Sequence, residues 1–374
     1  MDFKKYLSKN HIKKVRKNSQ FPNEVFIELL IHDYKTFSKI LELNKNFVLK
    51  GGAAAQLYIP LEGQRTSVDL DLVTSMSKKE VNEIMEKLGA EEYKPKKPSK
   101  ELPLRTYLIN INSVITPNQP RQVKIDVIFE KLSDYKVKNV NNIKLFILKL
   151  DFDMPVISKG SLIADKLLTL AKKSVGIRKA DKLKEVPKQI YDLIKLCEHV
   201  GLEDLNDLFF SFEKITISEL KYRKLKFSME EITNHIEETL NELCSIDVKS
   251  NDIKNNLNRF TSAYLNKPSR LTTEEWIIGG LKLRFLLNQV KEHIVRKKAP
   301  NDIFSELKRV KDNLTNIGKM SIDDKMKYRE KLIEEVRDKL TNWKHIKTRT
   351  EERIFLELEL VERMNKLLDS LRSY

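Results

Sequence analysis

Three aspartates on two strand-like segments have the residue type and spacing that metal-dependent phosphoryl transfer uses. Asp69 and Asp71 alternate with apolar residues over 68–72, and Asp126 stands between apolar residues in a second such segment. Successive side chains of a strand point to opposite faces, so Asp69 and Asp71 share a face at a separation of about 6 to 7 Å. The residue between them points into the core. One face of this strand is therefore suited to chemistry and the other to packing.

Carboxylates gathered in this way favour a bound cation. Two of them about 4 Å apart repel by roughly 4 kcal/mol at an effective dielectric near 20, so such a pair normally carries a proton or a cation. An isolated Asp-x-Asp is equally typical of a solvated strand. The third acid, in an otherwise apolar strand, favours a metal site formed by Asp69, Asp71 and Asp126. Such hard oxygen ligands suit Mg²⁺ or Mn²⁺.

A glycine pair precedes these acids in the chain. Gly51 and Gly52 follow a strand-like segment at 47–50 and precede a short helix-forming run. Glycine lets the backbone turn and approach a ligand, and the free N–H groups at a helix start bind phosphate oxygens. Arg65 and Ser67, which lead into the strand of the acids, are candidates for contacts with a triphosphate. The alternatives are an ordinary tight turn and a polar strand entry without a ligand.

Two ionisable residues lie inside apolar helical patterns further along the chain. Lys166 stands among leucines in the segment 161–173, and Asp192 is set among apolar neighbours in the segment 182–200. A lysine in such a place often extends its ammonium group to water and has no other role. The pattern alone leaves a structural and a functional role open for both residues.

Composition restricts the class of protein and its partners. The 374 residues, 40% of them hydrophobic, predict a globular protein of about two domains. A formal net charge of +16 attracts nucleic acid and nucleoside triphosphates, although lysines interleaved with glutamates also form ordinary solvated surfaces. Cys197 and Cys244 form no CxxC motif or Cys/His cluster, which argues against zinc and disulfides. Without an apolar signal segment or a stretch long enough to span a bilayer, we expect a cytoplasmic protein with no membrane association.

The elements that must position the site residues occupy the first half of the chain. Apolar residues at helical spacing predict a helix over 24–43, and strand patterns follow at 106–111 and 122–129. A further extended segment, at 143–150, is expected to join the same sheet before Pro155 ends it.

From residue 161 onward the pattern is almost entirely helical and closes with a charged run over 322–373. We therefore predict an α+β protein. A mixed sheet flanked by helices is expected in residues 1–200 and a helical C-terminal domain in residues 201–374.

Four sequence elements in this order resemble the AbiEii/AbiGii toxin branch of the DNA polymerase β-like nucleotidyltransferases. That superfamily typically pairs a Gly-Gly or Gly-Ser turn with Asp-x-Asp and a later third acid. The resemblance covers residues 24 to about 197. The matching elements are Leu49-Lys50-Gly51-Gly52-Ala53-Ala54, Arg65-Thr66-Ser67-Val68-Asp69-Leu70-Asp71, Ala164-Asp165-Lys166-Leu167-Leu168 and Gln189-Ile190-Tyr191-Asp192-Leu193.

The resemblance implies a polymerase β-like nucleotidyltransferase domain and a toxin of a type IV toxin–antitoxin pair, with its antitoxin encoded nearby. It implies transfer of a nucleotide from an NTP to an acceptor, for which the tRNA 3′ end is expected, with release of pyrophosphate. In a two-metal scheme, Asp69, Asp71 and Asp126 would be the ligands of Mg²⁺ or Mn²⁺. Asp192 would position Lys166 or a substrate hydroxyl. The nucleotide would be held by Gly51, Gly52, Arg65, Ser67 and Lys166.

Two other functions remain open from the sequence. The same site could transfer a nucleotide to a protein hydroxyl, or the chain could be a catalytically weakened module that binds NTP or RNA. Gln189 keeps the second alternative open, because relatives usually have an acid there and an amide cannot supply its charge.

Overall fold

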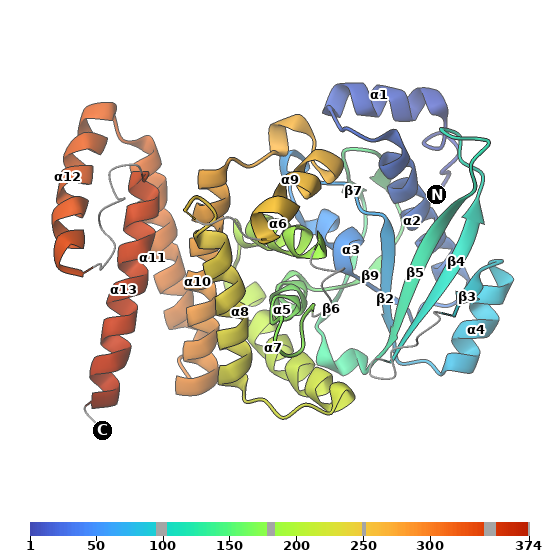
Figure 1. Cartoon of the computed structure of the whole chain (residues 1–374). Coiled ribbons are helices and arrows are strands. Elements are labelled where there is room, and N and C mark those ends of the chain that lie inside the picture. The colour runs from blue at the N-terminus through green and yellow to red at the C-terminus, as the bar shows by residue number, and fades with distance from the viewer. Residues whose placement is uncertain (95–102, 178–183, 249–251, 340–348, 373–374) are drawn as a thin grey trace.

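A mixed sheet of seven strands forms the centre of the N-terminal half (Figure 1). Strand β2 pairs in parallel with β5, strand β1 pairs in parallel with β9, and the other neighbours are antiparallel. In spatial order the strands are β3 (Glu91–Tyr93), β4 (Leu104–Ile111), β5 (Arg121–Phe129), β2 (Asp69–Thr74), β1 (Val48–Lys50), β9 (Met154–Ile157) and β6 (Val137–Val140).

This computed structural model describes residues 1–94, 103–177, 184–248, 252–339 and 349–372. Within these ranges a mixed sheet precedes a helical C-terminal region, which confirms the predicted α+β class.

The helices beside the sheet begin where their capping residues predict. Helix α2 (Glu24–Leu43) starts after Asn23, whose side chain accepts a hydrogen bond from the backbone N–H of Val25. Helix α4 (Lys78–Lys87) starts with a capping box formed by Ser77 and Glu80. Helix α3 (Gly51–Tyr58) starts directly after β1, so its first turn lies at the end of that strand.

The segment 143–150 differs from the expectation. Its backbone turns back at Leu145, whose N–H donates to the carbonyl of Leu148 at 2.8 Å, and β7 (Ile143–Lys144) pairs with β8 (Lys149–Leu150) as a separate two-stranded sheet. The expectation that this segment joins the main sheet was therefore wrong. The strand that does join it is β9, and Pro155 lies within that strand instead of ending it.

Helix α1 (Lys9–Ser19) packs on this small hairpin. The ring of His11 bonds the carbonyl of Ile147 at 2.9 Å, and Phe21 stacks on Phe146 with ring centroids 4.3 Å apart. The hairpin in turn reaches the segment before β2, because the N–H of Phe146 donates to the side chain of Gln64 at 3.0 Å.

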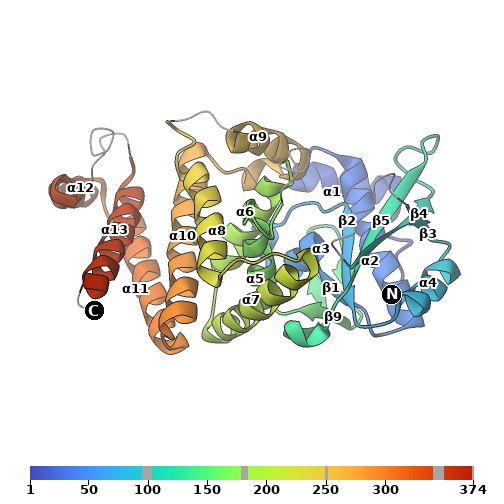
Figure 2. The same cartoon turned by 60° about the horizontal axis from the view of Figure 1, so that its bottom comes forward.

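Helices form the remainder of the molecule, with α10 at their centre. Two glycines let α10 pack closely: a β-carbon at Gly279 would lie 2.4 Å from Ile194, and one at Gly280 would lie 2.9 Å from Leu243. In both views α11 to α13 lie at the end of the molecule away from the sheet (Figures 1 and 2). The helices are α5 (Lys159–Thr169), α6 (Val186–Cys197), α7 (Leu202–Arg223), α8 (Met229–Cys244), α9 (Asp252–Tyr264), α10 (Thr273–Arg296), α11 (Pro300–Lys319), α12 (Ile322–Lys339) and α13 (Glu351–Arg372).

Candidate active site

A row of polar residues crosses four strands of the sheet. Thr106 of β4 lies opposite Asp126 of β5, which lies opposite Asp71 of β2, which lies opposite Lys50 of β1. Residues directly opposite one another in a sheet point to the same face, so these side chains gather on one surface. Asp69 shares that face two residues before Asp71. The structure thus places all three predicted acids together.

The glycine pair lies against this row. Gly51 has a φ of +72°, and a β-carbon there would lie 1.9 Å from Oδ2 of Asp71. A β-carbon on Gly52 would lie 2.6 Å from Oγ of Ser67 and 3.1 Å from Nη2 of Arg65. Only glycine fits at both positions, and the turn brings the first backbone groups of α3 beside the acids.

The surroundings of Asp71 disfavour ionisation of its carboxyl. Burial raises the pKa of its carboxyl to about 7, the charges of Asp126 and Asp69 add to the increase, and Lys124 and Lys50 partly oppose it. The carboxyl therefore gains from any further positive charge that binds beside it.

Lys124 is a site residue that the sequence analysis did not select. Its ammonium lies 2.5 Å from Oδ2 of Asp126 and 3.7 Å from Oδ1 of Asp69. Thr106 donates its hydroxyl to the other oxygen of Asp126 at 2.6 Å. Asp126 is therefore held from both sides by groups of its own sheet. Lys124 could have been found by its spacing, since it precedes Asp126 by two residues on the same strand.

Asp192, Arg65 and Lys166 form a buried ionic cluster behind Gly52. The guanidinium of Arg65 donates from Nε and Nη2 to the two oxygens of Asp192, both at 2.7 Å, and Lys166 donates to Oδ2 at 2.7 Å. Lys166 also donates to Oε1 of Gln189 at 3.0 Å. Burial raises the pKa of the Asp192 carboxyl, but the charges of Arg65 and Lys166 outweigh it and keep that pKa below its ordinary value.

The three charged side chains of this cluster are at most 2% exposed. In this structure the charged groups of Arg65 and Lys166 therefore face Asp192 and not an open surface. The pattern of the sequence indicated their buried surroundings but could not show that they share one partner.

A second buried cluster adjoins the row at Lys50. Its ammonium lies 2.9 Å from Oδ1 of Asp165, and the ring of Tyr135 lies 5.4 Å away. Tyr135 donates its hydroxyl to Glu130 at 2.5 Å. Burial lowers the pKa of Lys50, but Asp165 and the neighbouring groups reverse this and raise it well above its ordinary value. The residue before the glycine pair thus carries a fixed positive charge.

Asp33 of α2 is a further acid that sequence reasoning missed. It is fully buried, and neither carboxylate oxygen has a hydrogen-bond partner within the described residues. Burial raises its pKa well above the ordinary value, and Asp69 and Asp71 raise it further. The available signal was an acid placed between Leu30 and Phe37 on the apolar stripe of the helix.

Two observations indicate that the acids of the row are suited to a divalent ion. An ammonium group already lies between Asp69 and Asp126, where a cation would share them, and the carboxyl of Asp71 is disfavoured as an anion. Carboxylate oxygens are the donors that Mg²⁺ and Mn²⁺ use. Over the ranges that the structure describes, no three His, Cys, Asp or Glu side chains are arranged as a complete metal site. Lys124 occupies part of the space between the acids.

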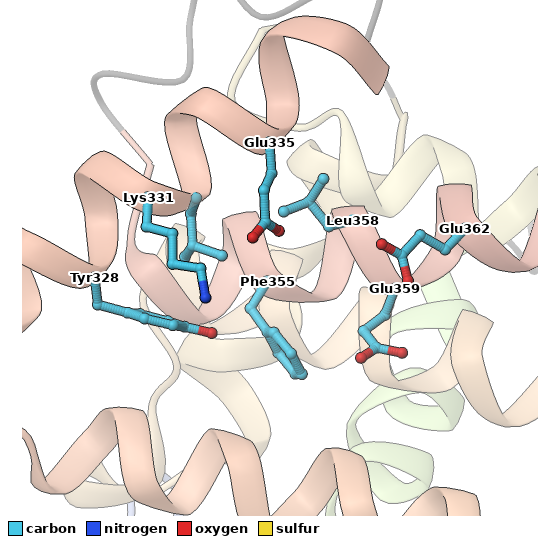
Figure 3. Close-up of a pocket in the computed structure, with 8 residues that line it drawn as sticks. Tyr328, Lys331, Glu335, Phe355, Leu358, Glu359 and Glu362 are labelled. Carbon is cyan, nitrogen blue, oxygen red and sulfur yellow. The ribbon is translucent and has the colours of Figure 1, made fainter.

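A hollow of about 100 Å³ between α12 and α13 is separate from this site (Figure 3). Its lining mixes acids, a lysine and aromatic residues, including Tyr328, Lys331 and Phe355. Another lining residue, Glu359, already accepts both hydrogen bonds of Arg309 at 2.7 Å.

None of the helices in the described ranges combines the length and apolar character that a membrane span requires.

Comparison with known proteins gives a family match across the site. The family model described as "Nucleotidyl transferase AbiEii toxin, Type IV TA system" matches residues 38–265. No curated protein matches the chain. The structure of JHP933 from Helicobacter pylori is similar at 16% identity and a TM-score of 0.40, over 78% of this chain and 99% of that chain. An antigenic nucleotidyltransferase-like protein from Paracoccidioides brasiliensis is similar at 15% identity and a TM-score of 0.33, over 60% of this chain and 98% of that chain.

A mixed sheet that carries acids beside a Gly-Gly turn, together with this match, defines the protein as a nucleotidyltransferase. The family match covers more than half of the 374 residues. The chain belongs to the AbiEii nucleotidyltransferase toxin family, and the expectation drawn from its four sequence elements is confirmed.

Proposed function

We propose that this chain transfers a nucleotide from an NTP to the 3′ end of tRNA, with release of pyrophosphate, in a reaction that requires Mg²⁺ or Mn²⁺. The observation that carries the proposal is the contact between the glycine turn and the acids. Gly51 has no room for a β-carbon beside Asp71, and Asp71 lies opposite Asp126. A phosphate-binding turn and a carboxylate site therefore meet at one point.

Asp69, Asp71 and Asp126 are the residues that would hold the metal. A divalent ion there would stabilise negative charge on phosphoryl oxygens, which is its usual part in nucleotide transfer. Lys124 and Thr106 keep Asp126 in place, and we propose that Asp126 also orients the attacking hydroxyl of the acceptor.

Gly51, Gly52 and Ser67 are the proposed contacts of the triphosphate. Backbone N–H groups at a helix start bind phosphate oxygens, and α3 begins at Gly51. Ser67 lies beside Gly52, at 2.6 Å from the place of its absent β-carbon.

For Arg65, Lys166 and Asp192 we propose a positioning role. Two cations and one carboxylate leave the cluster with a net charge of +1 behind Gly52, which favours an anion at the turn. An acid in place of Gln189 would neutralise that charge. The amide of Gln189 is therefore compatible with activity, because it accepts a hydrogen bond from Lys166 at 3.0 Å without cancelling the positive charge of the cluster.

The charge of the chain supports RNA as the acceptor. The formal net charge is +16, and α1 carries no acidic residue. This helix packs on the β7–β8 hairpin, which reaches the segment before β2 through Gln64. A polyanion bound along α1 would therefore lie on an element connected to the site. The exposed basic residues of α1 are Lys9, Lys13, Lys14, Arg16 and Lys17.

We also propose a partner and a division of the chain. Membership of a type IV toxin–antitoxin family supports a separate antitoxin encoded nearby. The proposed division assigns the chemistry to residues 1–200 and the helical domain to residues 201–374.

Labelled substrate tests the proposal. Purified protein is incubated with Mg²⁺, each α-³²P-labelled NTP in turn, total RNA and a cell lysate. The proposal predicts label in an RNA band of tRNA size that resists protease and disappears with nuclease. Label that resists nuclease and disappears with protease would show that the acceptor is a protein. NTP binding without any labelled product would support the module that binds without turnover.

A further inference from the structure

The ammonium of Lys124 occupies a cation position of the candidate site. Lys124 lies opposite Asp69 in the pairing of β2 with β5, and it precedes Asp126 by two residues on β5. Both relationships point its side chain to the face of the acids. Its ammonium lies 2.5 Å from Asp126 and 3.7 Å from Asp69, which places one positive charge between two of the three carboxylates.

The second oxygen atom of Asp126 also has a hydrogen-bond partner within the protein. This oxygen accepts the hydroxyl of Thr106 at 2.6 Å. Asp71, in contrast, receives no hydrogen bond from any described residue. The site thus contains one carboxylate with its partners in place and one that lacks a partner.

The backbone of Lys124 is fixed on both sides. In the sheet it lies between Leu108 of β4 and Asp69 of β2. Its side chain donates to Asp126 and faces Asp69, so its ammonium is held between the two carboxylates. A divalent ion bound between Asp69 and Asp126 would lie against this ammonium and be repelled by it. Asp71 is the carboxylate that stays open to a divalent ion.

We propose that Lys124 supplies one of the two positive charges that a two-metal scheme assigns to metal ions, so that the chain binds one divalent ion with its nucleotide and not two. This inference rests on the proposed function, because it concerns the cations of the same site. Lys124 remains in contact with Asp126 when nucleotide binds, and the single ion binds at Asp71.

Counting bound Mn²⁺ tests the inference independently of turnover. Free Mn²⁺ is measured by electron paramagnetic resonance in the presence of the α,β-methylene analogue of the preferred NTP, which cannot release pyrophosphate. We expect one bound Mn²⁺ per chain for the wild type and two for Lys124→Met. Lys124→Arg keeps the charge and is expected to bind one. Asp71→Asn is expected to lose the ion, which assigns the count to this site.

Lys138→Met is the matched control. Lys138 lies on β6 of the same sheet, is 38% exposed against 43% for Lys124, and also forms an ion pair, with Glu203 at 2.8 Å. The control is expected to bind one Mn²⁺.

Two bound Mn²⁺ in the wild type would overturn the inference and leave the proposed function intact, and so would one bound Mn²⁺ in Lys124→Met. No bound Mn²⁺ in the wild type would overturn the metal dependence of the proposed function together with this inference.

Discussion

Asp71 lies directly opposite Asp126 in the parallel pairing of β2 with β5. The two residues are 55 positions apart in the chain, and the register of the two strands alone makes them neighbours. A shift of this register by one residue would turn one of the two carboxylates to the opposite face of the sheet. The same strand pairing places apolar side chains in the core and the carboxylates on the opposite face of the sheet. Substitution of a carboxylate can therefore change the site without changing the core.

The contribution of Asp71 to the stability of the metal-free protein should fall as pH rises from about 4 to about 7. The pKa of the Asp71 carboxyl is raised to about 7 in the folded state, so the folded state binds a proton that the unfolded state has released. Its ionisation then costs at most about 4 kcal/mol of unfolding free energy. Urea unfolding at a series of pH values in the presence of a chelator measures this dependence. Asp71→Asn should lose this part of the slope, and an unchanged slope in the variant would contradict the assignment.

Asp33 and Glu28 are two fully buried acids of α2 with opposite surroundings, and their neutral variants should change stability in opposite directions at pH 8. Asp33 has no partner within the described residues, whereas Glu28 accepts from Ser113 and from the N–H of Val114, each at 2.6 Å.

At pH 8, Asp33→Asn should raise the free energy of unfolding, because an unpaired carboxylate near Asp69 and Asp71 is removed. The gain should shrink as pH falls towards the ordinary carboxyl pKa of about 4, where the unfolded chain begins to bind the proton that the folded wild type already holds. Glu28→Gln should lower stability by about 1 to 3 kcal/mol. Chemical denaturation of both variants at pH 8 and pH 4 decides between these signs. A loss of stability in Asp33→Asn at pH 8 would show that Asp33 has a partner.

Gly51→Ala should abolish transfer. The new β-carbon would lie 1.9 Å from Oδ2 of Asp71, so the turn or the acid must move. Gly89→Ala is a matched control, because Gly89 has a φ of +71° and no heavy atom within 4 Å of the added carbon. Both variants should lose about 1 kcal/mol or more of stability from the positive φ. Only Gly51→Ala should lose labelled product. Equal activity of the two variants would show that the glycine turn is not part of the active site.

Asp192→Asn should destabilise the fold by about 3 to 5 kcal/mol, because it leaves the buried charges of Arg65 and Lys166 without their shared anion. Asp69→Asn, at a side chain that is 36% exposed, should leave stability nearly unchanged while it abolishes transfer. Thermal unfolding and the labelling assay, applied to both variants, separate the positioning residue Asp192 from Asp69, an acid of the site. If Asp192→Asn unfolds at the wild-type temperature, the buried cluster does not support the fold as described.

The alternation of side chains in a strand allowed part of the site to be predicted. It placed Asp69 and Asp71 on one face, and the apolar neighbours of Asp126 indicated the same for the third acid. The Gly-Gly pair was recognised as a place of close backbone approach, and the structure shows that Asp71 is the group that approaches it. These features depend on local spacing, which a single sequence contains.

Features that depend on contacts between distant segments could not be predicted. Arg65 points to Asp192 because α6 packs behind the glycine turn, and the two residues are 127 positions apart. The segment 143–150 has the residues of a strand, but a turn at its centre folds it onto itself. The spacing of Lys124 places it on the face of Asp126, but its ion pair with Asp69 exists only once β2 and β5 are paired.

The most direct test of the central claim is the intact mass of a defined RNA acceptor, a tRNA with a mature 3′ end, after incubation with the protein, Mg²⁺ and NTP. The account predicts that wild-type protein adds the mass of one or more nucleoside monophosphates to the RNA and that Asp71→Asn adds none. An unchanged mass with the wild type would contradict the proposed acceptor. An equal increase with Asp71→Asn would contradict the assignment of the site to the acids of β2 and β5.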